Sequence, residues 1–273
     1  MARFVIVPQW QGSPSARAMQ LIDGAQAIAG DLPRTACTTI EVPLEAGEAL
    51  ETGVLRYSAL SRTQDALADE IVRTAPPVIV VGGDCGVSIG AIGAAAEREE
   101  ALALVWFDAH PDLHTPETSI SGAFGGMALS AVLGEGAPGL ALPKGAVPAA
   151  RVVLAGARDY EPDEEIRVGE LAITAIDVAD LADTAGLAAA VAQTGASGVY
   201  LHIDLDVLDP SELTGLTAPV PFGLTLAQLL AAIAAVRAVA PLAGATIAGF
   251  APASTAAAVE DLGSILRIVG ALA

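Results

Sequence analysis

Basic residues are scarce in this chain of 273 residues, and so are cysteines and histidines. Lys and Arg together number 13 against 32 Asp and Glu, which gives a formal net charge of −19. A chain this acidic repels nucleic acid and anionic membranes, so we expect neither as a partner. The negative charge is compatible with a cationic small-molecule substrate, and also with solubility or adaptation to salt.

The two cysteines, Cys37 and Cys85, are too few for a disulfide framework and are typical of a reducing cytoplasm. The first residues, MARFVIVPQWQGSP, hold only a short apolar run that ends at Pro8. Because no cleavage-like site follows this run, we expect no signal peptide. These features predict a soluble, cytoplasmic protein.

Uninterrupted apolar runs of membrane-spanning length are also missing. The longest apolar region, residues 224–250, is broken by Gln228, Arg237 and Pro241, which favours a buried helix followed by a strand. Hydrophobic residues make up 53% of the chain and charged residues 16%, as is typical of a compact globular protein. With no linker or fixed-period repeat, residues 1–273 are expected to form a single domain.

What the chain does have is an alternation of short apolar runs with helical patterns. The runs are apolar on both faces, as in the central strands of a parallel sheet. They occupy residues 3–7, 76–84, 102–110, 150–159, 198–210 and 242–252. Helical patterns occupy residues 58–75, 87–101, 185–195, 226–240 and 258–273. This alternation predicts a three-layer α/β/α fold around a central sheet.

Polar residues gather where the expected strands end. They are Asp84 and Cys85, then Asp108, His110 and Asp112, then Arg158 and Asp159, and finally Asp204, Asp206 and Asp209. The carboxyl ends of strands in an open α/β sheet converge on one crevice, so we expect these four clusters to be neighbours in space. The densest cluster lies in FDAHPDLHTPE, residues 107–117, where alternate residues of an extended segment would share a face.

Several aspartates at the edge of an apolar core would repel one another, and Arg158 is the only cation expected beside them. Divalent cations resolve this repulsion, because they bind carboxylate oxygens, and imidazole suits manganese, iron, cobalt or zinc. Taken singly, Asp204 could cap a turn, Asp209 could belong to a turn, and His110 could be a hydrogen-bonded core histidine. The matched positions of the whole set favour a metal site.

Three blocks, GGDC (82–85), DAHPD (108–112) and HIDLDVLDPS (202–211), resemble the signatures of the ureohydrolases, the arginase and agmatinase family. Their order and separations are similar to those of the family, over about residues 80–255. The resemblance implies a mostly parallel sheet of about eight strands with two manganese ions at the strand ends. It also implies a homo-oligomer, a trimer or hexamer.

Carried over by position, the implied metal ligands are Cys85, Asp108, His110, Asp112, Asp204 and Asp206. Asp108 and Asp204 would bridge the two ions. Asp112 would also accept a hydrogen bond from the bridging hydroxide, which attacks the amidine carbon of the substrate. Cys85 stands where the family has a histidine, and a soft thiolate would weaken manganese binding or favour another ion. Alternatively Cys85 is a spectator thiol beside an empty site, or pairs with Cys37.

Other departures concern the substrate. Gly125 replaces a histidine that the family uses to shuttle protons to the leaving amine, and His114 is a candidate substitute. With TPET and GGM, the changes at 85 and 125 resemble a branch that hydrolyses Nω-hydroxy-L-arginine in D-cycloserine biosynthesis. A hydroxyguanidine is less basic than a guanidine, so its cleavage depends less on protonation by the enzyme.

Gly249 stands where the family has its guanidinium-binding glutamate. A charge-assisted contact of that kind contributes roughly 1.5–3 kcal/mol, so its loss indicates another substrate or reduced activity. By the same resemblance Thr217 would lie near the guanidinium, and Ser121 and Glu161 would hold the α-carboxylate and α-amino groups. Two alternatives stay open: a single-metal deacetylase, which shares this fold, and a non-catalytic metal-binding relative.

Overall fold

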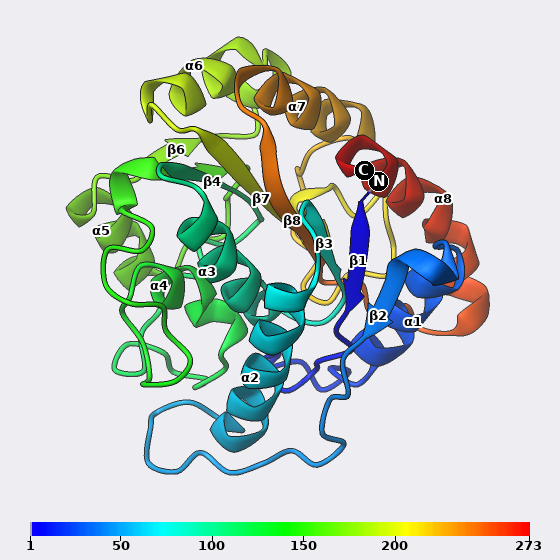
Figure 1. Cartoon of the computed structure of the whole chain (residues 1–273). Coiled ribbons are helices and arrows are strands. Elements are labelled where there is room, and N and C mark those ends of the chain that lie inside the picture. The colour runs from blue at the N-terminus through cyan, green and yellow to red at the C-terminus, as the bar shows by residue number, and fades with distance from the viewer. Residues whose placement is uncertain (1) are drawn as a thin grey trace.

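A computed structural model describes residues 2–273, in which eight strands form one sheet (Figure 1). The strands are β1 (Arg3–Ile6), β2 (Cys37–Thr39), β3 (Val78–Val81), β4 (Leu102–Phe107), β5 (Val152–Ala155), β6 (Thr174–Ile176), β7 (Gly198–Asp204) and β8 (Leu242–Ala248). Their order in the sheet is β2-β1-β3-β8-β7-β4-β5-β6. Every neighbouring pair is parallel, so the expected sheet of about eight strands is confirmed.

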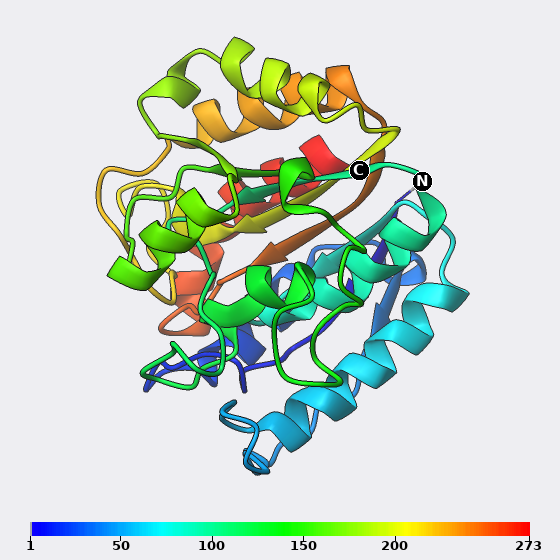
Figure 2. The same cartoon turned by 90° about the vertical axis from the view of Figure 1, so that its left-hand side faces the viewer.

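Helices cover both faces of the sheet, which confirms the three-layer α/β/α class (Figures 1 and 2). They are α1 (Gln20–Gly30), α2 (Tyr57–Arg73), α3 (Ile89–Arg98), α4 (Ala128–Val132), α5 (Pro162–Glu170), α6 (Ala185–Gln193), α7 (Leu226–Val239) and α8 (Thr255–Leu272). Buried side chains of α1, α6, α7 and α8 pack against one face, and those of α2, α3 and α4 pack against the other.

The central strands are apolar because helices bury both of their faces. Every residue of β3, β4 and β7 is buried, which explains why these runs show no alternation of polar and apolar residues. The edge strands β2 and β6 have three residues each, and most of them are exposed. None of the helices among residues 2–273 combines the length and the apolar character needed to cross a membrane.

Four adjacent central strands, β3, β8, β7 and β4, bring distant parts of the chain together. Because all four run in the same direction, their carboxyl ends lie at one edge of the sheet. The single domain expected over residues 1–273 stays a prediction, and Met1 lies outside the described residues.

Candidate metal centre

The acidic clusters meet at this edge of the sheet. Asp108 directly follows β4 and Asp204 is the last residue of β7. Cys85 opens a short 3-10 turn, Cys85–Ser88, that is separated from the end of β3 by three residues. These residues border a cavity of about 310 Å³. The convergence expected from the sequence is therefore present in the fold.

One group of donors consists of Asp108, His110 and Asp206. Nδ1 of His110 lies 3.1 Å from Oδ2 of Asp206 and 3.4 Å from Oδ1 of Asp108. Burial opposes a positive charge on His110, yet hydrogen bonds to the two aspartates raise its pKa to about 12. Burial, together with the charge of Asp108, raises the pKa of Asp206 to about 6. The imidazole and the two carboxylates are therefore coupled in one polar group.

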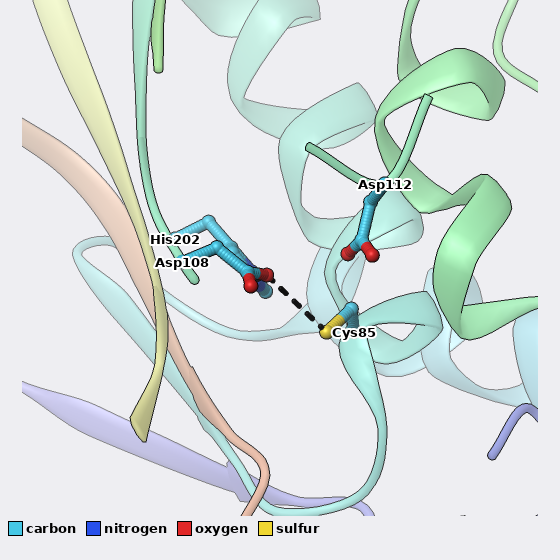
Figure 3. A group of neighbouring side chains, drawn as sticks. All are labelled: Cys85, Asp108, Asp112 and His202. Carbon is cyan, nitrogen blue, oxygen red and sulfur yellow. Dashed lines mark hydrogen bonds and ion pairs between the residues drawn. The ribbon is translucent and has the colours of Figure 1, made fainter. Parts of the chain in front are cut away.

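A second group consists of Cys85, Asp108, Asp112 and His202, whose donor atoms lie within 4.8 Å of one another (Figure 3). All four residues are buried. Figure 3 shows Cys85 and Asp112 approaching from one side and Asp108 and His202 from the other. Sγ of Cys85 is 3.8 Å from Oδ2 of Asp108. Asp108 belongs to both groups, so it joins them.

Asp112 is held in an uncommon backbone conformation. Its φ is 53°, in the left-handed region that non-glycine residues rarely adopt. Its carbonyl oxygen accepts hydrogen bonds from the N–H groups of Leu129 and Ser130, at 3.0 and 3.3 Å, which fixes this turn. Oδ2 of Asp112 is buried without a hydrogen-bond partner. Burial, together with the charge of Asp108, raises the pKa of Asp112 well above its usual range.

Asp204, expected as a bridging ligand, lies beside Cys85 rather than in either group of donors found among the described residues. The Cys85 thiol donates to Oδ2 of Asp204 at 3.0 Å, and Oδ1 accepts from the Asp206 N–H at 2.9 Å. Burial, followed by the charges of Asp112, Asp204 and Asp108, raises the pKa of Cys85 well above its usual value. Pairing of Cys85 with Cys37 is excluded, because both are free thiols.

The residues present fit divalent cations. Two donor groups, each with a nitrogen and carboxylate oxygens, share Asp108, and all of their members except the half-buried His110 are buried. Buried carboxylates this close together carry an unfavourable charge that protons relieve only in part. Two residues of the second group each have a buried atom without a hydrogen-bond partner, namely Oδ2 of Asp112 and Nε2 of His202. Unsatisfied buried polar atoms are uncommon, and a bound ion would satisfy both.

His202 was missed by the sequence interpretation. It lies within β7, two residues before Asp204, in a run otherwise judged to be core. Alternate residues of a strand share a face, so its spacing from Asp204 was the available signal. Asp159 was placed near the site but given no role, and its Oδ2 lies 3.7 Å from Nε2 of His110.

Arg158, the only cation expected beside the aspartates, does not form an ion pair with them in the described part of the chain. Its guanidinium instead donates to backbone carbonyl groups of the loops beside β5 and after β7, including those of Asp206 and Val220 at 2.8 and 2.7 Å. No ion pair between Arg158 and a carboxylate is found among residues 2–273. Arg158 therefore fixes the loops, and its hydrogen bond with Asp206 is made to the backbone carbonyl oxygen rather than to the carboxylate.

The residues expected to contact substrate also border the cavity. His114 is buried, and its Nε2 lies 3.4 Å from Oε2 of Glu161 and 3.8 Å from Oε2 of Glu164. Ser121 is exposed, and its hydroxyl accepts a hydrogen bond from the Ala123 N–H at 3.2 Å. The Thr217 hydroxyl donates to the carbonyl oxygen of Gly249 at 2.8 Å, a contact that holds the chain just after β8.

Comparison with known proteins identifies the family to which these features correspond. A model of the arginase family matches residues 14–264. The arginase of Bacillus caldovelox is 33% identical over 201 residues, which cover 68% of this chain and 67% of that protein. The arginase of Bacillus subtilis strain 168 is 34% identical over 155 residues, and this match spans only 52% of that protein.

Solved structures share the fold over almost the whole chain. The arginase of Entamoeba histolytica, crystallised with L-ornithine, has a TM-score of 0.86 at 21% identity, with 99% of this chain and 97% of that chain covered. The proclavaminate amidino hydrolase of Streptomyces clavuligerus has a TM-score of 0.77 at 20% identity, with 99% and 90% covered. At such identities the likeness establishes the fold alone.

Proposed function

The chain belongs to the arginase family, and from this premise we propose that it is a metal-dependent hydrolase of a linear amidine, with Nω-hydroxy-L-arginine as the favoured substrate. Two divalent ions, manganese or a substitute, would be held by Cys85, Asp108, His110, Asp112, Asp204 and Asp206. The reaction cleaves a C–N bond of the amidine with water. A homotrimer or homohexamer is part of the same proposal.

The observation that carries this proposal is the pair of donor groups that share the buried Asp108 at the border of an acidic cavity. Eight carboxylate residues line this cavity, and none of its described lining residues is Lys or Arg. An acidic lining of this kind favours a cationic ligand over an anionic one. A volume of about 310 Å³ suits a small molecule.

When bound at these groups, divalent cations supply a nucleophilic hydroxide at neutral pH. Side chains of the protein would orient the attacking oxygen and the substrate. Asp112, held by its backbone contacts with Leu129 and Ser130, belongs to the second donor group and would accept a hydrogen bond from the attacking oxygen. The exposed Glu161 would bind the substrate's α-amino group, and Ser121 its α-carboxylate.

The leaving amine needs a proton, and Gly125 cannot give one. His114 borders the same cavity and is paired with Glu161 and Glu164 through Nε2. An imidazole at this position can serve as the general acid that donates a proton to the leaving amine. A hydroxyguanidine demands less from this donor than a guanidine does, which is why it is the favoured substrate.

The test is product release from Nω-hydroxy-L-arginine, L-arginine and agmatine by protein loaded separately with manganese, cobalt or zinc. We expect hydroxyurea release to exceed urea release from either unmodified guanidine. His114→Asn should lower kcat by at least about 100-fold, the usual contribution of a general acid. The matched control is Cys37→Ser, a thiol that is not among the cavity-lining residues.

Two outcomes would contradict the proposal. Absence of turnover with every metal and every amidine would favour a non-catalytic relative, for which Gly125 and Gly249 are the motivating observations. Hydrolysis of acetylated lysine or an acetylated polyamine with one zinc per chain would instead identify a deacetylase.

A further inference from the structure

We propose that His202 is a metal ligand, and that it supplies from β7 the imidazole that is missing at position 85. The ion site would then be formed by the Cys85 thiolate, the His202 imidazole, and carboxylate oxygens of Asp108 and Asp112 (Figure 3). The inference extends the proposed function, since it assigns the second metal site. It concerns binding and can be tested without turnover.

The ring of His202 is fixed on two sides. It is fully buried and stacks on Trp106, with ring centroids 3.5 Å apart and an angle of 17° between the planes. Nδ1 of His202 lies 2.7 Å from the hydroxyl oxygen of Ser88. If Nδ1 carries the hydrogen and donates it to Ser88, Nε2 has a free lone pair. Metal-binding histidines commonly have this arrangement, in which an oxygen atom accepts from the other ring nitrogen.

The free nitrogen lies within reach of the other three donors. Nε2 of His202 is buried without a hydrogen-bond partner, and so is Oδ2 of Asp112. Both residues have a donor atom within 4.8 Å of those of Cys85 and Asp108. A buried polar atom without a partner is destabilising, so two of them in one cluster need an explanation. A single cation bound by all four residues would provide one.

A simple His202–Asp108 pair does not explain these atoms. Nε2 of His202 lies 3.8 Å from Oδ2 of Asp108, which is too long for a hydrogen bond. The same Oδ2 already accepts a hydrogen bond from Nε1 of Trp106 at 3.2 Å. Such a pair would also leave the Asp112 oxygen unsatisfied.

This donor set determines which ions suit the site. A thiolate with an imidazole and carboxylates favours zinc or cobalt over manganese. The other group, Asp108, His110 and Asp206, offers only an imidazole and hard oxygens, which suit manganese. To bind the cation, Cys85 must release its thiol proton to solvent through the cavity that it lines. The chain would therefore hold two chemically different ions.

The direct test uses the unmodified full chain labelled with ¹⁵N-histidine and loaded with ¹¹³Cd. Only three histidines are present, so their ring nitrogens can be resolved and assigned. We expect scalar coupling of cadmium to Nε2 of His202, while Nδ1 retains its proton. A His202 signal without cadmium coupling in a protein that has bound two ions per chain would overturn the proposal.

Variants supply the second measurement. Cobalt-loaded protein should show a sulfur-to-metal charge-transfer band that Cys85→Ser abolishes and Cys37→Ser leaves unchanged. His202→Gln should keep this band but weaken cobalt affinity by at least about tenfold, and Ser88→Ala should weaken it by about 10–100-fold. Circular dichroism must show that each variant is folded. Unchanged affinity in folded His202→Gln would show that His202 serves packing alone, whether or not the chain hydrolyses any amidine.

Discussion

Gly249 shows how a single residue can restrict what the site is able to hold. Its φ is 84°, in the left-handed region that favours glycine. A Cβ at this position would overlap Oδ1 of Asp204 and lie 2.8 Å from Oδ2. The sequence suggested that the family's glutamate had simply been lost here. The structure adds that both the backbone conformation at position 249 and the position of the Asp204 carboxylate require a glycine there.

We therefore expect that Gly249→Glu does not restore the arginine hydrolysis for which the family uses a glutamate at this position. A side chain at this φ costs about 1–3 kcal/mol, and its Cβ would displace Asp204. Urea denaturation should show lower stability, and equilibrium dialysis should show weaker metal binding. Gly249→Ala is the matched control and should reproduce most of both losses, because the clash begins at Cβ. Arginine hydrolysis gained by the glutamate variant at unchanged metal content would contradict this account.

At the scale of elements, the buried strands could be predicted from the sequence and the exposed edge strands could not. The central strands β3, β4 and β7 were predicted because their continuous apolar runs have no competing interpretation. The edge strands β2 and β6 were not predicted, since three mostly exposed residues carry no periodic signal. Their pairing is imposed by the neighbouring strands rather than by their own sequence.

The approximate position of the candidate site could also be predicted from the sequence, with two exceptions. Acidic residues at strand ends were placed correctly, because strand direction alone brings them to one edge. His202 was missed because it is a polar residue inside an apolar strand, and its partners Ser88 and Trp106 come from other elements. Arg158 was the only cation expected beside the aspartates, but its guanidinium donates to backbone carbonyl groups, whose positions no sequence pattern reveals.

The β7–β8 pairing contains a buried polar contact that can be tested by substitution. The hydroxyl groups of Tyr200 and Thr246 lie 2.7 Å apart, and both side chains are buried. Tyr200→Phe should destabilise the protein by about 1–3 kcal/mol in urea denaturation, because the Thr246 hydroxyl is left unpaired. The double variant with Thr246→Val should recover part of this loss. Equal stability of wild type and Tyr200→Phe would show that the pair contributes nothing.

At the scale of the whole molecule, the metal centre connects the sheet. Its donors come from the segments after β3 and β4 and from β7, which are separated by long stretches of chain. The chain also carries a formal net charge of −19, which disfavours the compact state through self-repulsion. Cations bound among the buried carboxylates would oppose this repulsion where it is strongest, so metal content should affect global stability.

Removal of the metal is therefore expected to lower the melting temperature. A ligand that binds only the folded state at 100 times its Kd stabilises it by about 2.7 kcal/mol, or roughly 5–10 °C for a chain near this size. Calorimetry of chelated and manganese- or zinc-loaded protein measures this shift, and Asp108→Asn, which alters both groups, should abolish it. Potassium chloride at matched ionic strength controls for screening of the net charge. An equal shift with potassium would show that general electrostatics, rather than a bound ion, stabilises the fold.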